Sequence, residues 1–257
     1  VSYEFAVNDV LYKAAFTGGK LTQKLPTFFG DLSNHYDVKL FTLAIEVDSS
    51  IFRFGYGHSI LDFSNADLDL LGFALDTLSA ANVPGASRFA ELAVYDHFWT
   101  HFFDFGYQYD DGRFLIQSEI VGRRAKSYIV TNDDAFYLLA GYRIGHWTPY
   151  VRYSQTNSLN DRTDVPVINA DYTNNDLYKL MADGINGFGA EMTTLDERNC
   201  WTLGTRLDIA DNYALKMQVD TLTKPAANSA FFQNFTPDFL YSRQHFTLYS
   251  MTLDFVF

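Results

Sequence analysis

The feature that most constrains the fold of this chain is an alternation of apolar and polar residues in segments of about ten residues. In KLFTLAIEV, residues 39–47, every second residue from Phe41 to Val47 is apolar, whereas Thr42 and Glu46 lie between them. The same division recurs in 51–60, 102–109, 113–123, 136–144, 147–154, 200–209 and 213–220. Successive side chains of a strand point to opposite faces, so these segments predict antiparallel β-strands with one apolar and one polar face.

Composition narrows the class of protein. The 257 residues include 24 Phe and 17 Tyr, and the net charge of −12 argues against nucleic acid as a partner. No apolar run is long enough to predict a membrane-spanning helix. The single cysteine, Cys200, excludes an internal disulfide framework, and it is interpreted as an inert thiol. Two all-β classes remain, a soluble β-sandwich and a membrane β-barrel.

The connections between the segments alternate in length. Short, turn-like connections are predicted at 48–50, 110–112, 145–146 and 210–212. Long ones are predicted at 17–35, 63–87, 125–132, 158–197 and 224–244. Short turns at one end and long loops at the other are typical of outer-membrane barrels, and loops of this length are unusual in a sandwich. We therefore predict an all-β fold, an antiparallel transmembrane β-barrel with short periplasmic turns and long extracellular loops, as one domain over 1–257.

The last residues, TLYSMTLDFVF, carry apolar side chains at alternate positions: Tyr249, Met251, Leu253, Phe255 and Phe257. This ending resembles the terminal strand of Gram-negative outer-membrane proteins, in which such residues are read by the barrel-assembly machinery. The hairpins FGYQYDDGRFLIQSEI, AGYRIGHWTPYVRYS and LGTRLDIADNYALKMQVD resemble those of porin-type channels. The resemblance covers most of residues 36–257. It implies a location in the bacterial outer membrane, in contact with lipid and lipopolysaccharide.

A porin-type barrel implies passive diffusion of small hydrophilic solutes or ions through a charged aqueous lumen, without cofactor, bound metal or catalysis. A homo-oligomer is compatible with the resemblance. Two other functions stay open. The barrel could be a structural sheath around a partner protein, or an outer-membrane enzyme. The enzyme is disfavoured because the six histidines are scattered, with no nucleophile at a diagnostic offset.

Charged residues on the predicted polar face are the candidate pore-lining residues. They are Lys13, Glu46, Arg53, Asp104, Arg113, Glu119, Arg123, Arg143, Arg152, Arg206, Asp208, Lys216 and Asp220. Arginines facing carboxylates across a lumen would set up a transverse field that orders water and ions. The alternative is a salt-bridged interior that holds the shape of the barrel and selects nothing.

The N-terminal stretch SYEFAVNDVLYKAAF, residues 2–16, is interpreted as a hairpin with a turn at VND. That interpretation gives about eleven strands, whereas single-chain bacterial barrels have an even number. Either an N-terminal portion of a longer porin is missing, or residues 1–16 form one strand and the barrel has ten. The short length of the chain relative to porins favours the fragment.

Two further segments carry predictions. In loop 63–87, Leu68, Leu71, Leu75 and Leu78 have helical spacing, so we predict a short amphipathic helix, with the hypothesis that it folds inward and narrows the channel. It could equally lie against the outer wall or a neighbouring subunit. His97 and His101 are four residues apart, which on a strand is too far for one metal ion, so we place them near the outer aromatic belt.

Overall fold

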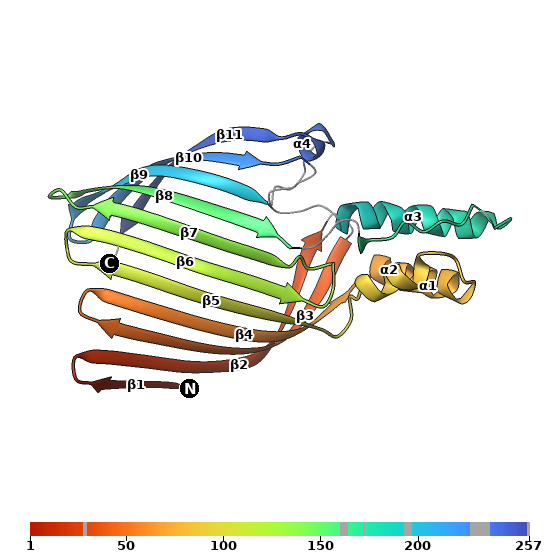
Figure 1. Cartoon of the computed structure of the whole chain (residues 1–257), viewed down its shortest axis with the longest axis horizontal. Helices are drawn as coiled ribbons and strands as arrows, with labels where there is room; N and C mark the ends of the chain where they lie inside the picture. The colour runs from red at the N-terminus through yellow and green to blue at the C-terminus, as the bar shows by residue number, and fades with distance from the viewer. Residues whose placement is uncertain (28–29, 160–163, 172, 193–196, 227–236, 256–257) are drawn as a thin grey trace.

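The computed structural model describes residues 1–257 except 28–29, 160–163, 172, 193–196, 227–236 and 256–257. The described residues form one antiparallel sheet of eleven strands, in which each strand pairs with its neighbours in the sequence (Figure 1). The strands are β1 (Ser2–Val7), β2 (Val10–Thr27), β3 (Gly30–Val47), β4 (Ser50–Ser64), β5 (Phe98–Asp110), β6 (Phe114–Ala125), β7 (Asp133–Tyr142), β8 (Trp147–Ser158), β9 (Arg198–Ala210), β10 (Tyr213–Lys224) and β11 (Gln244–Phe255). The helices are α1 (Ala66–Ala80), α2 (Ala86–Leu92), α3 (Asp176–Met192) and α4 (Pro237–Tyr241).

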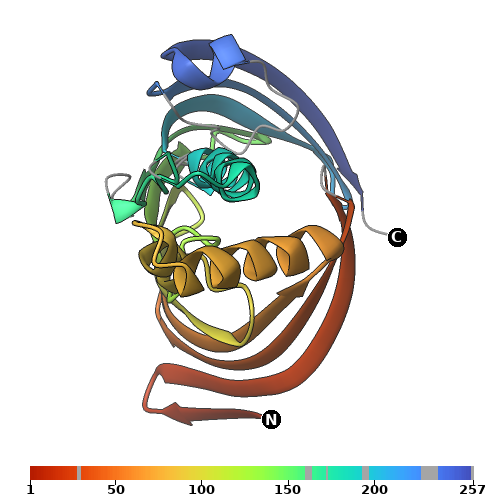
Figure 2. The ribbon, with the colours of Figure 1, turned by 90° about the vertical axis from the view of Figure 1, so that its right-hand side faces the viewer.

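The sheet curls around an interior, as the end-on view in Figure 2 shows. Within the described residues, β1 and β11 form the two edges and do not pair with each other. The prediction of an all-β, antiparallel fold of barrel type is confirmed, with a sheet that is not closed. No helix among the described residues is both long enough and apolar enough to cross a membrane.

The predicted connections are confirmed at one end of the sheet and partly wrong at the other. Tight turns join β3 to β4, β5 to β6, β7 to β8 and β9 to β10, as expected. Residues 17–35 are wrong as a long loop, because β2 continues to Thr27 and β3 begins at Gly30, in register from Val10–Val47 to Thr27–Gly30. Backbone pairing extends through this polar stretch because the alternation, although weaker, still suits a strand. The hairpin in residues 2–16 is confirmed, and a single strand over 1–16 is wrong.

The long connections at the other end carry the helices. The predicted helix in 63–87 is confirmed as α1, whose N-terminus is capped by the side chain of Asn65, which accepts a hydrogen bond from the Leu68 N–H. Asp67 and Asp69 in the first turn complement the helix dipole. Leu68, Leu71, Leu75 and Leu78 face a shared apolar core with α2 and α3, centred on the fully buried Phe89.

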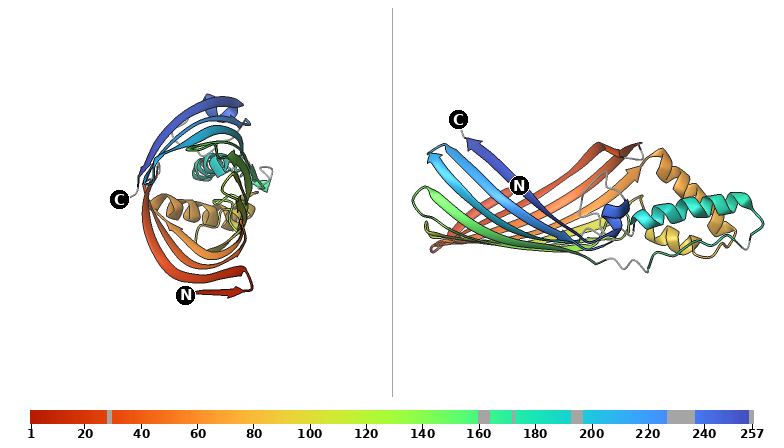
Figure 3. Two further views of the ribbon diagram at one scale, coloured as in Figure 1. Left: turned by 90° about the vertical axis from the view of Figure 1, so that its left-hand side faces the viewer. Right: turned by 90° about the horizontal axis from the view of Figure 1, so that it is seen from above.

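This helical cluster lies beyond the strand ends, as the view from above in Figure 3 shows. Seen from that end, α1 crosses in front of the opening of the curled sheet (Figure 2). The core of the cluster combines residues of α1, α2 and α3 with Ile168 and Ala170. The helices therefore stand over the end of the sheet, on their own apolar core. That α1 narrows a channel stays a hypothesis.

The two faces of the sheet differ in exposure: apolar side chains are exposed on one face, and polar side chains are buried on the other. On β9 the apolar Leu203 is 68 % exposed, whereas Thr202, on the opposite face, is 1 % exposed. Tyr150 on β8 reaches across β9 to donate a hydrogen bond to Gln218 on β10, 2.9 Å away. Gly204 on β9 leaves room for the Tyr150 ring to cross, and the low exposure of Thr202 places this face on the inside of the curl. The polar face is therefore concave, and the apolar face is convex and exposed.

Aromatic side chains pair across strands on the convex face. The ring centroids of Phe54 and Phe105 lie 5.0 Å apart, and those of Tyr153 and Trp201 lie 4.8 Å apart. The Phe103 ring lies directly over Gly122 on β6, where an added Cβ would be 1.9 Å from the Phe103 Cζ. Glycine at this position therefore lets an aromatic ring lie flat against the sheet.

This contact predicts the effect of filling the space under Phe103. We expect Gly122→Val to displace the ring and lower the free energy of unfolding by about 1–3 kcal/mol. Gly19→Val on β2 is the matched control, because nothing lies within 4 Å of its added Cβ, and it should leave stability unchanged or slightly higher. Urea unfolding of both variants in the same lipid or detergent checks this. Equal midpoints for the two variants would contradict the packing described.

Candidate functional site

The strand register brings the charged residues of the concave face into rows. One row crosses five strands, from Lys13 on β2 through Ala44 and Arg53 to Gly106 and Glu119 on β6, each residue directly opposite the next. Directly opposed residues of an antiparallel pair share a face, so the row places two cations and one carboxylate on the same wall. The alternation pattern predicted the face, and the register adds which residues are neighbours.

A cavity of about 440 Å³ lies along this row, on the wall formed by β1 to β6. The charged side chains that line it are Glu4, Lys13, Arg53, Asp104 and Glu119. Beside it, Lys13 Nζ donates to Glu46 Oε1 at 2.7 Å. Three carboxylates therefore face two cations along the cavity lining, and one of those cations is already paired with Glu46.

Two glycines give Arg53 and Asp104 their positions. Gly55 lies opposite Asp104, and Gly106 lies opposite Arg53. A Cβ on Gly55 would be 1.8 Å from Asp104 Oδ2, and a Cβ on Gly106 would be 3.3 Å from Arg53 Nε. The missing side chains leave room for each charged group to lie across the neighbouring strand. A cation and a carboxylate are thus held on adjacent strands, against the wall.

A second polar cluster occupies the concave face of β8 to β10. The Thr202 hydroxyl donates to Asp220 Oδ1, and Gln218 Nε2 donates to Asp220 Oδ2 at 2.8 Å. Arg152 Nη2 donates to Thr202 Oγ1 at 3.1 Å and lies 3.7 Å from Asp220 Oδ1. Tyr150 completes the network through Gln218. Asp220 is buried and held by three side chains, so this part of the wall is more rigidly organised than the cavity near Arg53.

Ion pairs continue along both ends of the concave face. At the turn end they join Arg143 to Asp110, Arg206 to Asp208 (2.6 Å) and Lys216 to Asp254 (2.6 Å). Toward the loop end, Arg123 pairs with Asp133, and its Nε donates to the Thr131 carbonyl oxygen at 2.8 Å. The side chains at the turn end remain one-third to nearly one-half exposed. They are therefore open to water that enters the curl of the sheet.

One candidate, Arg113, departs from this arrangement. It precedes β6, and its guanidinium lies 5.1 Å from the centroid of the Tyr142 ring and donates to the Tyr142 hydroxyl. Tyr142 is opposite Phe114 on the apolar face. Arg113 thus lies with aromatic side chains of the convex face at the turn end, away from the concave rows. The alternation did not predict this, because the strand begins one residue later, at Phe114.

Several residues of the concave face were missing from the sequence-based candidates. Tyr150, Thr202 and Gln218 join the Asp220 network, and Asp110 and Asp133 pair with predicted arginines. Polar uncharged residues give no distinct signal in an alternating pattern. Asp110 and Asp133 stand at strand boundaries: the sequence placed Asp110 in a turn, and Asp133 falls between the predicted loop 125–132 and the predicted strand 136–144.

The proposed assembly residues lie on the edge strand β11. Tyr249, Met251, Leu253 and Phe255 are all exposed on the convex face. Phe257 lies outside the described residues. Recognition of these side chains by assembly machinery stays a prediction.

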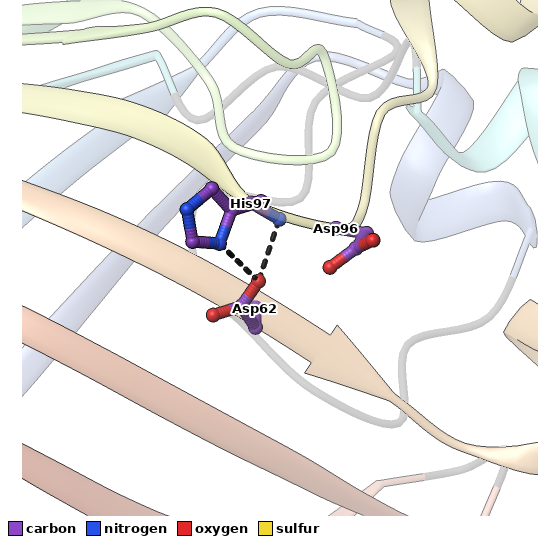
Figure 4. Close-up of side chains that lie close together, drawn as sticks. All are labelled: Asp62, Asp96 and His97. Carbon is purple, nitrogen blue, oxygen red and sulfur yellow. Dashed lines mark hydrogen bonds and ion pairs between the residues drawn. The ribbon is translucent and has the colours of Figure 1, made fainter.

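The histidines of the predicted aromatic belt separate into two groups. His101 is on the convex face, 4.8 Å from Trp99 between ring centroids, and its Nδ1 lies 2.7 Å from the Tyr56 hydroxyl. His97 instead meets Asp62 and Asp96 where β5 begins (Figure 4). Asp62 Oδ1 accepts from the His97 backbone N–H at 2.6 Å and lies 3.3 Å from its ring Nδ1.

These three side chains place one donor atom each within 4.8 Å of one another, a spacing compatible with a cation. The neighbouring Asp62 carboxyl raises the pKa of Asp96. Asp62 already accepts a hydrogen bond from the His97 backbone N–H, and this bond fixes the bend before β5, where His97 has φ 50°. Sequence reasoning missed Asp62 because it is 35 residues from His97 and approaches only through the pairing of β4 with β5.

Cys200 belongs to the Asp220 network. Its Sγ is buried, 3.9 Å from both Thr202 Oγ1 and Asp220 Oδ1. The neighbouring Thr202, Gln218 and Asp220 side chains are hydrogen-bonded to each other, and the inertness of the Cys200 thiol stays a prediction.

Comparison with known proteins adds a likeness in fold. No protein-family model and no curated protein matches the chain. The crystal structure of the ferric citrate transporter FecA in the unliganded form is similar at 10% identity and a TM-score of 0.37, over 100% of this chain and 46% of that chain, so this chain spans less than half of it. Two crystal structures of Pseudomonas aeruginosa OpdO, one titled OccK3, are similar at 13% identity, with TM-scores of 0.31 and 0.30, over 98% of this chain and 76% of theirs.

Proposed function

We propose that this chain forms the wall of an outer-membrane channel through which small hydrophilic solutes or ions diffuse passively. The observation that carries the proposal is the inverted exposure of the sheet, in which Leu, Phe and Tyr face outward while charged groups face inward. In water, such a convex face would expose a far larger apolar patch than monomeric soluble proteins tolerate. In a bilayer, the same face contacts hydrocarbon at no such cost.

The convex face also becomes polar toward the loop end. Lys39, His58, His101 and Arg124 stand directly opposite one another across β3 to β6. The neighbouring row toward the turns contains Phe41, Tyr56 and Phe103. A polar row bordered by aromatic rings is the pattern expected where hydrocarbon gives way to lipid headgroups. The loop end would then face outward from the cell and the turns would face the periplasm.

The concave charges supply the mechanism of selection. Arg53 and Asp104 lie on adjacent strands and set up a local field across the wall that orders water and ions. Carboxylates outnumber cations along the cavity lining by three to two, which favours cations weakly. No covalent step is involved, and the protein acts as a pore and not as an enzyme.

The exposed leucines offer a direct test of the lipid contact. Leu203 on the convex face and Leu248 on the concave face are 68 % and 55 % exposed. We expect Leu203→Arg to lower the free energy of unfolding in lipid bilayers by about 2–4 kcal/mol, because a guanidinium enters hydrocarbon. Leu248→Arg, the same substitution opposite Asp220, should be tolerated. If denaturant unfolding in vesicles shows that both variants are equally stable, the convex face does not contact lipid.

The ion preference can be tested by replacing the charged side chains of the cavity lining with neutral ones. With the full-length protein in planar bilayers under a salt gradient, we expect a small cation preference that falls in the double variant Asp104→Asn, Glu119→Gln. Arg53→Gln should raise it, because only Lys13, which is already paired with Glu46, then opposes the carboxylates of the lining. A reversal potential that all three changes leave unmoved would reject these residues as pore lining. Insertion without any conductance would reject the channel and favour a barrel that sheathes a partner protein.

The glycine positions give a steric test with a matched control. Gly55→Ala is expected to push the Asp104 carboxylate off the wall and into the lumen, because the added Cβ meets it at 1.8 Å. Gly57→Ala lies on the same face of β4, where the nearest side-chain atom is 3.6 Å from the added Cβ, so no shift is needed. We expect single-channel conductance to fall in the first variant and to stay at the wild-type value in the second. Identical conductances would show that Asp104 does not border the path of ions.

A further inference from the structure

An apolar cavity of about 670 Å³ opens between α1 and α3, in the helical cluster at the loop end. Its lining comes from three separate parts of the chain: the end of β4 with α1, residues 129–130, and α3. The volume lies within the range of pockets that bind small molecules. It is a different place from the charged cavity on the concave face, and no residue lines both.

The lining of this cavity follows from the pattern of α3. Leu177, Met181, Gly184 and Phe188 recur at helical spacing and face the cavity. Lys179 and Asp183 lie on the other side of the helix and do not line it. Leu180, at the rim, is 70 % exposed. One apolar side of α3 thus packs onto the shared core with α1 through Ile185 and also borders the open cavity.

The polar groups of the lining restrict what the cavity accepts. Only Asn65 and Asp67 are polar among its lining residues, and none of the lining residues is basic. The Asn65 oxygen is already engaged as the N-cap of α1. An anionic ligand would meet the Asp67 carboxylate without a compensating cation, so an acidic amphiphile such as a fatty acid is disfavoured.

We propose that this cavity binds an uncharged apolar small molecule, a compound of alkyl or aryl character. Transfer of such a molecule from water is favourable because it buries its own surface and that of the exposed leucines. Figures 2 and 3 place the helices over the end of the curled sheet, so the ligand would be captured at the mouth. The inference goes beyond diffusion of hydrophilic solutes and does not depend on conduction.

Two glycines of α3 provide a matched pair of variants. An added side chain at Gly184 or Gly187 meets nothing within 4 Å, so neither substitution is expected to disturb the packing. Gly184 lines the cavity and Gly187 does not. Leucine raises helix propensity equally at both positions. Gly184→Leu therefore fills the cavity, whereas Gly187→Leu leaves it open.

The experiment uses a photoreactive probe on the full-length protein. An uncharged long-chain alkyl alcohol bearing a diazirine is irradiated with each variant, and labelled peptides are identified by mass spectrometry. We expect labelling of α1 and α3 in wild type and Gly187→Leu, competed by the same alcohol without the diazirine. Labelling should fall by roughly tenfold in Gly184→Leu, since leucine occupies the volume the ligand needs. Labelling of the convex strand faces provides the internal reference and should stay constant.

Four results would overturn the proposal. Equal labelling of α1 and α3 in both leucine variants would place the probe elsewhere, and labelling that excess alcohol does not reduce would show no saturable site. Cross-links between two copies through α3 would assign the cavity to a subunit interface. A matching carboxylic-acid probe that labels the helices as strongly as the alcohol would contradict the role of Asp67.

Discussion

The structure depends on backbone hydrogen bonds that stay within the sheet. Ten antiparallel pairings, each between strands adjacent in sequence, satisfy the interior strands and allow apolar side chains to face outward. In hydrocarbon, a strand edge without partners is costly, because no water is present to replace the missing bonds. Because β1 and β11 run in the same direction, pairing them would be parallel, unlike every other pair in the described sheet. In a membrane, the two edges would therefore need further hydrogen-bond partners.

Because the backbone hydrogen bonds are made within the sheet, the side chains are free to differ between its two faces, which are apolar on the convex side and charged on the concave side. Convex rings pair across strands, as Phe54 does with Phe105, and they need no polar partner. Concave charges find partners on neighbouring strands, but many of these pairs are half-exposed, and such pairs contribute little to stability. Their contribution to folding is therefore small, which fits the role proposed for them in ordering water and ions. The Asp220 network differs, since its carboxylate is buried and fully engaged.

The sequence predicted those parts of the structure that obey a period of two. The assignment to the polar face is correct for Lys13, Arg53 and Arg152, because each lies inside a strand. It is wrong for Arg113, because this residue precedes β6 and its side chain is not bound by the alternation of the strand. The loop assigned to 17–35 was wrong for a related reason: pairing in β2 and β3 persists where hydrophobic alternation fades. Helix α1 was predictable from leucine spacing, whereas its position over the sheet depends on contacts with α2 and with α3, which lies far along the chain.

The charged concave face and the apolar cavity make opposite demands on a solute. Lys13, Arg53 and Glu119 favour groups that keep their hydration, while the leucines of α1 and α3 favour groups that lose it. Because the two surfaces share no residue, each can be altered without the other, and Gly184→Leu should leave conductance intact while Gly55→Ala leaves the helices intact. A molecule with both characters would meet the apolar cavity first, because the helices stand at the loop end. The loss of water from its apolar part would then govern entry of such a molecule at the helices, and its charge would govern its passage along the strands.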